Sequence, residues 1–347
     1  MRCQPWCIIS AASLGVGACT SCQDVATVPA GDAGLADAGA DAPGDTKGDV
    51  GACKPALPPM KFVTISRGAF VMGSPTGEPG RGKHSETQVQ VTLTHDIEMT
   101  ATEITQSQWQ ALCLFDPSDG ATGTGQRSGV GPDFPVGTVT YWDALSYANE
   151  LSAFAGLSQC YKLLGCSGAI GQRRNCVGVE PVEKSFYDCP GYRLPTNAEF
   201  EYANRAGTTT ATYAGEVLDQ PDAGVITYPD PSIDTIGWCG ATGGSTTHAV
   251  GKLVPNVWGI YDMIGNAGEW VDGNFNGLGY GPGPLTDPFG SIGSIKNDAG
   301  FEGLGGILRG GASSSFNRQC RSAEQSEVPR TDGTSNNVGF RLVRTLK

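Results

Sequence analysis

Short runs of alternating apolar and polar residues organise most of this chain. From Gln88 to Thr94, every second residue is apolar, which is typical of a strand with one buried face. The runs Lys61–Ile65 and Ala69–Met72 predict two earlier strands, and Asn337–Leu342 predicts a strand that closes the domain. The pattern therefore indicates a domain built from short elements.

Capping boxes predict three short helices along the chain. In each box a threonine is followed three residues later by a side chain that can bond back to the threonine N–H. The pairs are Thr105 with Gln108, Thr140 with Asp143, and Thr196 with Glu199. We expect the third helix to end at Arg205-Ala206-Gly207, because glycine commonly terminates helices.

Composition favours loops over long elements. The 347 residues include 51 glycines and 22 prolines, which is typical of a loop-rich fold. The net charge of -12 argues against nucleic acid and anionic membrane surfaces as partners, because both repel an acidic protein.

The first residues predict export. The apolar stretch Ile8–Ala18 follows Arg2 and is too short to span a membrane, so residues 1–18 are expected to be a signal peptide. The segment Val16-Gly17-Ala18-Cys19 resembles a bacterial lipobox, which predicts a lipid on Cys19 and attachment to the bacterial cell envelope through that lipid, facing the periplasm or the exterior. A plain secretory signal is the alternative. Residues 20–52 hold few large apolar side chains, so residues 19–52 form a lipidated, disordered linker before a domain at 53–347.

Cysteine content fits an oxidising compartment. Of twelve cysteines, nine remain after the signal peptide and the lipidated residue are set aside, and this odd number leaves at least one unpaired within the chain. A glycine-rich insertion holds four of them without a Cys-x-x-Cys pair, which favours two local disulfides over zinc. These four are Cys160, Cys166, Cys176 and Cys189, and three connectivities stay open.

Several ordered blocks resemble the formylglycine-generating, or sulfatase-modifying factor, family. The most specific are Tyr192–Ala203, Pro255–Trp270, and Leu308-Arg309-Gly310-Gly311 followed by Gly339-Phe340-Arg341, with Thr102-Glu103-Ile104-Thr105 among the earlier ones. The resemblance covers about Lys61 to Arg344. It implies an α+β fold that is irregular and loop-rich and is related to C-type lectin domains.

The resemblance also implies candidate site residues. In the family's oxidases, two cysteines bind copper and handle the substrate cysteine, because thiolates suit Cu(I). Alignment from Arg309 places Ser315 on the first of these cysteines and Cys320 on the second, so the cysteine pair is incomplete. Cys320 is the candidate catalytic residue if the protein is an oxidase, and a buried thiol or one arm of a disulfide if it is not.

A calcium site is implied by the same resemblance. Its ligands would be the side chains of Asp262 and Glu269 and the carbonyls of Gly265 and Ala267, which together form a hard oxygen cage. The structural alternative is that both carboxylates cap turns. The three histidines, His84, His95 and His248, lack metal-ligand spacing.

The sequence thus predicts an exported lipoprotein whose domain is a non-catalytic or divergent binding module. Its expected ligand is an exported protein, a peptide or a carbohydrate, which would contact loops such as Phe275–Tyr280. One alternative is an oxidoreductase that uses copper and oxygen to convert a sulfatase cysteine to formylglycine. Another is a purely structural envelope component.

Overall fold

A computed structural model describes residues 53–82, 86–119, 129–218, 229–273, 283–289, 295–296, 302–303, 305–329 and 337–347. The chain divides into two units, Met1–Val50 and Gly51–Lys347, and every described residue belongs to the second unit. The predicted signal peptide, Cys19 and the linker therefore lie outside the described residues.

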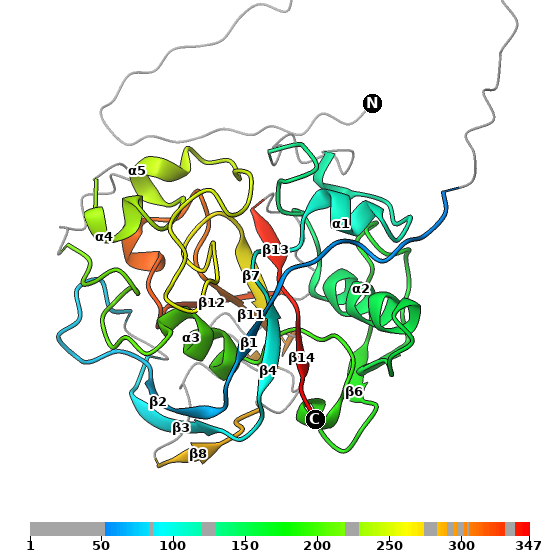
Figure 1. Cartoon of the computed structure of the whole chain (residues 1–347), viewed down its shortest axis with the longest axis horizontal. Helices are drawn as coiled ribbons and strands as arrows, with labels where there is room; N and C mark the ends of the chain where they lie inside the picture. Colours follow the sequence, from blue (N-terminus) through cyan, green and yellow to red (C-terminus); the bar gives the residue numbers. More distant parts are fainter. Residues whose placement is uncertain are drawn as a thin grey trace, which may run out of the picture. The chain divides into compact units, whose positions relative to one another are not determined.

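Strands from distant parts of the chain form two central sheets (Figure 1). The first has the order β1 (Phe62–Ile65), β4 (Ile97–Thr100) and β14 (Val343–Thr345), and the second has the order β12 (Gln325–Pro329), β11 (Gly305–Arg309), β7 (Gly268–Val271) and β13 (Val338–Phe340). Neighbouring strands are antiparallel except β13, which runs parallel to β7 and pairs Gly339 with Glu269. The end of the described chain thus contributes to both sheets.

Smaller sheets complete the strand content. They contain β2 (Gly68–Met72), β3 (Val89–Leu93) and β8 (Leu285–Thr286) in one group, β5 (Tyr161–Leu164) with β6 (Gly178–Pro181), and β9 (Ile295–Lys296) with β10 (Glu302–Gly303). Along β3, buried and exposed residues alternate without a break, so the predicted half-buried strand is confirmed. The predicted closing strand is present as β13, and two residues, Arg341 and Leu342, separate it from β14.

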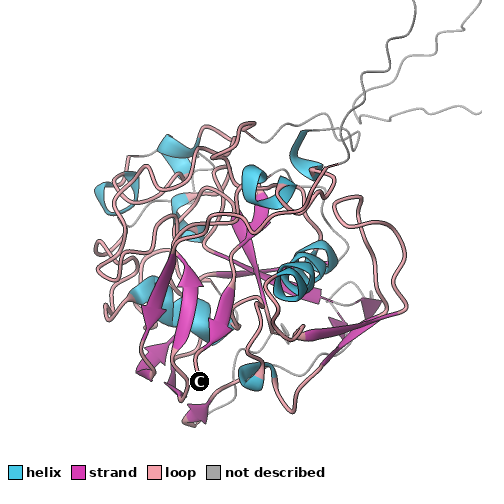
Figure 2. Cartoon of the chain, turned by 45° about the vertical axis from the view of Figure 1, so that its right-hand side comes forward, coloured by secondary structure: helices cyan, strands magenta, loops and turns pink. Residues whose placement is uncertain are grey.

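The helices are short, and Figure 2 shows that loops make up much of the domain. The α-helices are α1 (Gln106–Gln110), α2 (Tyr141–Phe154), α3 (Asn197–Arg205), α4 (Pro231–Asp234) and α5 (Gly240–Gly243), and the 3-10 helices are η1 (Pro117–Asp119), η2 (Phe186–Asp188) and η3 (Asn317–Gln319). All three predicted capping boxes are present. None of the helices in the described ranges is long and apolar enough to cross a membrane.

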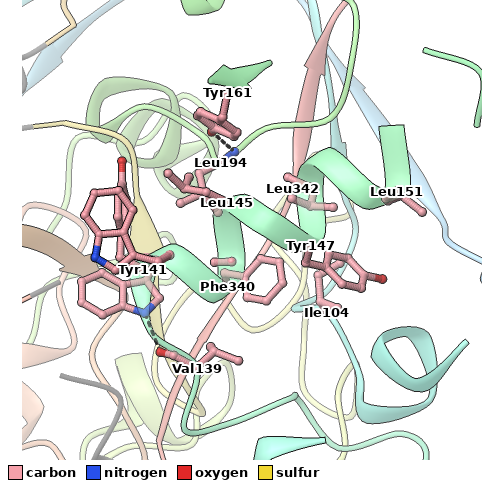
Figure 3. Packing of buried hydrophobic residues seen from close by; sticks show 14 of the residues in the cluster. Ile104, Val139, Tyr141, Leu145, Tyr147, Leu151, Tyr161, Leu194, Phe340 and Leu342 are labelled. Atoms are coloured by element: carbon pink, nitrogen blue, oxygen red, sulfur yellow. Dashed lines mark hydrogen bonds between the residues drawn. The ribbon is translucent and has the colours of Figure 1, made fainter. Parts of the chain in front are cut away.

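The largest hydrophobic cluster lies around α2 (Figure 3). The ring of Tyr147 on α2 stacks on Trp109 of α1 with centroids 5.0 Å apart, and Phe340 of β13 meets Tyr147 edge-on at 5.5 Å. The buried Trp270 satisfies its indole N–H through the carbonyl oxygen of Val139 at 2.9 Å. This cluster joins the helices to the second central sheet.

Four fully buried arginines connect separate segments of the chain. Each forms an ion pair with a buried glutamate, and the pairs are Arg193 with Glu199, Arg309 with Glu201, Arg321 with Glu86, and Arg341 with Glu269. A buried charge is tolerated only when it is paired and hydrogen-bonded. Each pair therefore fixes the position of the segments that carry its two partners.

Disulfides brace the domain at four places. They join Cys53 with Cys113, Cys160 with Cys189, Cys166 with Cys176, and Cys239 with Cys320. The two local disulfides predicted for the glycine-rich insertion are confirmed, and their connectivity is nested. Cys22, the ninth cysteine of the sequence count, lies outside the described residues.

Candidate functional site

The loop from Asp262 to Glu269 leads into β7 and holds several residues in left-handed backbone conformations. The φ angles are 56° at Asp262, 75° at Gly265 and 62° at Asn266. Glycine adopts this region without strain, and Asp and Asn tolerate it better than other side chains. A Cβ at Gly265 would also collide with the backbone of Trp238, so this position requires glycine.

Both carboxylates predicted for the cation site lie inside the protein. Asp262 is 2% exposed and Glu269 is 0% exposed. Arg341 donates two hydrogen bonds to Glu269, from Nε to Oε2 and from Nη2 to Oε1, each 2.7 Å long. Arg341 also donates to the carbonyl oxygens of Tyr261 and Asp262, so it ties the start of the loop to its end.

A third buried carboxylate, Glu103, contacts the same loop. It is 0% exposed, and its two oxygens accept from the Ala267 N–H at 2.8 Å and from Nδ2 of Asn266 at 2.7 Å. Burial, together with the charges of Asp262 and Glu269, raises the pKa of Glu103 well above its usual value. Three carboxyl groups thus surround a single guanidinium, which leaves an excess of negative potential in the loop.

The loop fits a hard cation by the chemistry of its oxygens. Oδ2 of Asp262 accepts from the Gly251 N–H at 2.7 Å, whereas Oδ1 is buried and has no hydrogen-bond partner. None of the hydrogen bonds found among the described residues ends on the carbonyl oxygen of Gly265 or Ala267. Two carboxylates and two carbonyls of this kind suit calcium. Calcium stays a prediction, with Asp262, Gly265, Ala267 and Glu269 as its ligands.

Side chains alone do not form a metal centre in the described ranges. No three His, Cys, Asp or Glu side chains converge there as a metal-binding group. His95 and His248 lie apart in the fold, on the loop before β4 and beside Trp238, and His84 lies outside the described residues. A cation in the loop would therefore depend on its backbone carbonyls.

The cysteine loop, residues 310–320, runs from the end of β11 through η3 and ends at a disulfide-bonded cysteine. Cys320 is 0% exposed and bonded to Cys239, with the two Cα atoms 6.6 Å apart. The hydroxyl of Ser315 accepts from the Ala312 N–H at 3.0 Å, which makes it part of a local turn. Cys320 is thus one arm of a disulfide, and its catalytic assignment stays a prediction that requires this bond to be reduced first.

The residues around Cys320 do not fit Cu(I). A disulfide sulfur is not a thiolate, and the hydroxyl of Ser315 is a hard, neutral group that is a poor ligand for a soft ion. The segment that carries Cys239 also packs directly on this loop, because the Gly240 N–H donates to the Ser315 carbonyl at 3.0 Å. At Gly243 a Cβ would collide with the Ser313 carbonyl, so only glycine allows this close approach.

Asn266 connects the two loops. Its N–H donates to the Trp238 carbonyl and its own carbonyl accepts from the Ser313 N–H, both at 2.9 Å. Its side chain accepts from the His248 N–H at 2.7 Å and donates to Glu103. His248 in turn stacks face to face on Trp238, with ring centroids 3.9 Å apart. The predicted cation loop and the cysteine loop therefore form one continuous structure.

Arg321, the residue after Cys320, anchors a separate buried network of carboxylates. It contacts Glu78, Glu86 and Glu324 at 2.5, 2.8 and 3.1 Å. Burial works to raise the pKa of Glu86, but hydrogen bonds and charge from Arg321 lower it to about 2. Burial and the neighbouring Glu86 raise the pKa of Glu324 to about 7.

Because of the raised pKa of Glu324, we expect the free energy of unfolding to fall as the pH rises from about 4.5 to 7. In that window native Glu324 keeps a proton that the unfolded chain, with its ordinary pKa, has released, so the native state binds more protons. The loss reaches at most about 3 kcal/mol at pH 8. Calorimetry between pH 4.5 and 8 measures it, and Glu324→Gln should make the profile less steep. An unchanged slope in this variant would contradict the assignment.

Sequence reasoning located part of this site and missed the rest. It selected the loop with Asp262, Gly265, Ala267 and Glu269, but it gave no role to Glu103, Arg341 or Cys239. Glu103 and Arg341 lie in the blocks Thr102–Thr105 and Gly339–Arg341 that carry the resemblance, so their presence in those blocks was the available signal. The loop Phe275–Tyr280, predicted to contact ligand, lies outside the described residues.

Comparison with known proteins assigns the class. Residues 49–346 match the family model of the sulfatase-modifying factor enzyme 1-like domain, so the chain belongs to this family. The chain is 28% identical over 298 residues to the formylglycine-generating enzyme of Streptomyces coelicolor, covering 80% of this chain and 87% of that enzyme. It is also 40% identical over 91 residues to the formylglycine-generating enzyme of Mycobacterium tuberculosis, which covers 24% of this chain and 28% of that enzyme.

A relative with another name matches part of the domain. The chain is 29% identical over 194 residues to the chaperone protein LppX of Paenibacillus barcinonensis, a match that covers 54% of this chain. The matched regions span 65% of LppX and 28% of the mycobacterial enzyme.

Solved structures confirm the fold. Treponema denticola variable protein 1 superposes with a TM-score of 0.59 at 24% identity, covering 82% of this chain and 95% of that one. PvdO from Pseudomonas aeruginosa gives a TM-score of 0.59 at 23% identity, covering 82% and 94%. These likenesses establish the predicted irregular, loop-rich α+β fold.

Proposed function

We propose that this member of the sulfatase-modifying factor family is an exported, lipid-anchored binding module that does not oxidise cysteine. The observation that carries the proposal is the buried disulfide between Cys320 and Cys239, which occupies the loop where the family's oxidases hold their thiols. With Ser315 at the other position, the loop offers no thiolate for oxygen chemistry. What remains is a rigid set of loops that can present a surface.

An exported polypeptide is the proposed ligand. The name of LppX, a chaperone, supports this class of ligand, since a chaperone contacts other polypeptides. Loops on a scaffold held by disulfides and buried ion pairs bind with little loss of conformational entropy, which favours recognition. A carbohydrate is the alternative ligand, and a protein without any ligand would be a structural envelope component. A thermal shift with unfolded peptides, but not with oligosaccharides, is the expected result.

Export and anchoring are part of the same proposal. Four disulfides in one domain suit an oxidising compartment, and the lipobox-like segment supports a lipid on Cys19. Metabolic labelling with radioactive palmitate tests the anchor, because label that persists in Cys19→Ser would contradict it. Calcium in the loop from Asp262 to Glu269 would then come from the extracytoplasmic medium and would stabilise the loop by neutralising its carboxylates.

The competing function is conversion of cysteine to formylglycine, which the names of two relatives favour. We expect no conversion of a Cys-x-Pro-x-Arg peptide by the full chain with Cu(I), a thiol reductant and oxygen, as read by mass spectrometry. The Streptomyces coelicolor enzyme is the positive control under the same conditions. Aldehyde formation that disappears in Cys320→Ser would overturn the proposed function and make the protein an oxidase.

A further inference from the structure

Glu103 stands out among the buried carboxylates because both its oxygens bind the loop from Asp262 to Glu269 from a distant part of the chain. It lies between β4 and α1, 163 residues before Asn266. Unlike Glu269, it has no arginine within hydrogen-bonding distance among the described residues, since its bonds go to one backbone N–H and one amide. A buried carboxylate costs stability unless a positive charge lies nearby, and the nearby charge of Arg341 is already bonded to Glu269.

The bonds around Glu103 fix the directions of two carbonyl groups. The described peptide bonds are all trans, and in a trans peptide the C=O and N–H point in opposite directions. The Asn266 N–H points at Trp238, so the Gly265 carbonyl points away from Trp238. The Gly268 N–H points at Asn337 at 2.7 Å, so the Ala267 carbonyl points away from Asn337.

Glu103 holds the Asn266–Ala267 peptide, which lies between the peptides that carry the Gly265 and Ala267 carbonyls. The Ala267 N–H donates to Oε1 of Glu103, and the Asn266 side chain donates to Oε2. Rotation of this peptide would turn both neighbouring peptides, because the three units share the Cα atoms of Asn266 and Ala267. Glu103 therefore controls where the Gly265 and Ala267 carbonyls point.

We propose that Glu103 is a positioning residue for a divalent cation, preferentially calcium, bound by the loop from Asp262 to Glu269. It fixes the Asn266–Ala267 peptide, and with it the directions of the Gly265 and Ala267 carbonyls, in the same loop in which Oδ1 of Asp262 is buried without a partner. This inference rests on the proposed calcium site, and it assigns Glu103 a role outside the set of ligands.

Isothermal titration of the full chain with CaCl2, after EDTA treatment, tests the role of Glu103. In Glu103→Gln only one acceptor oxygen remains, so one of the two bonds to the loop is lost. Outer residues that orient metal ligands typically contribute 10–100-fold to affinity, and we expect Kd to rise by about that factor. Thermal unfolding should show a smaller increase in Tm on calcium addition than the unmodified chain shows.

Glu199→Gln is the matched control. Glu199 is also buried, at 1% exposed, and it accepts from the Thr196 N–H at 2.8 Å, but it pairs with Arg193 and not with the loop. This variant should lose stability and keep the calcium Kd of the unmodified chain. Loss of affinity in Glu199→Gln equal to that in Glu103→Gln would overturn the proposal, since a general loss of packing would then explain both.

The remaining outcomes separate this inference from the calcium site itself. If Glu103→Gln binds calcium with the Kd of the unmodified chain while Glu269→Gln loses binding, the positioning role is overturned and the calcium site still stands. If calcium gives neither binding heat nor a change in Tm with the unmodified chain, both the calcium site and the role of Glu103 are overturned. This result would not bear on whether the module binds a polypeptide. If Glu103→Gln does not fold, Asn266→Ala removes the amide that Glu103 holds, and an unmodified Kd in that variant overturns the proposal.

Discussion

Replacing Arg341 with methionine should lower the free energy of unfolding by about 3–5 kcal/mol, because it leaves Glu269 buried without its partner. Both side chains are 0% exposed, and the two bonds between them are each 2.7 Å long. Arg341 also holds the carbonyls of Tyr261 and Asp262, so the loop from Asp262 to Glu269 would lose its internal tie. Urea unfolding in EDTA measures the effect without a contribution from a bound cation.

Arg344 provides the matched control for this prediction. It lies three residues later and also pairs with a glutamate, Glu98, at 2.7 Å, but these side chains are 32% and 24% exposed. A partly exposed pair of this kind contributes less than about 1 kcal/mol, so Arg344→Met should unfold almost as the unmodified chain does. Equal losses in the two variants would show that burial of the Glu269 pair does not matter.

Removing the disulfide between Cys239 and Cys320, by changing both residues to alanine, should cost about 4.5 kcal/mol through the entropy of the unfolded chain. The bond closes a segment whose ends are 81 residues apart, and it joins the cysteine loop to the segment packed on it. The reduced domain should also label at both positions with a thiol reagent. Thermal unfolding of the double variant measures the loss.

The short disulfide in the insertion sets the scale. Cys166 and Cys176 are only 10 residues apart, so changing both to alanine should cost less, about 2.7 kcal/mol. A larger loss in the Cys166 and Cys176 variant than in the Cys239 and Cys320 variant would mean that loop entropy does not dominate. It would also weaken the view that the Cys239–Cys320 bond fixes the cysteine loop to the segment that carries Cys239.

Local signals in the sequence were enough to place much of the secondary structure. Each capping box is a contact between residues three positions apart, so Thr105, Thr140 and Thr196 predicted helix starts from sequence alone. The alternation along β3 likewise depends only on neighbouring positions. The pairing of β13 with β7 and of β14 with β4 could not be predicted in this way, because it depends on contacts between distant segments.

The residues of the candidate site also divide into those that local sequence could suggest and those that only the folded chain brings together. The ligands predicted for calcium come from one continuous loop, so a motif could suggest them. Glu103, Arg341 and Cys239 come from three other segments and meet the site only in the folded chain. The sequence showed an incomplete cysteine pair at Ser315 and Cys320, but it could not show which sulfur Cys320 contacts.

The position of β13 and β14 has a consequence for the order of folding. Residues 338–345 supply a strand to each central sheet and the arginine that pairs with Glu269, so neither sheet is complete before this segment has been synthesised. Contacts between residues so far apart close slowly, because the entropy of a long loop must be lost first. A nascent chain of this topology therefore completes its two central sheets only late, which would suit the proposed export.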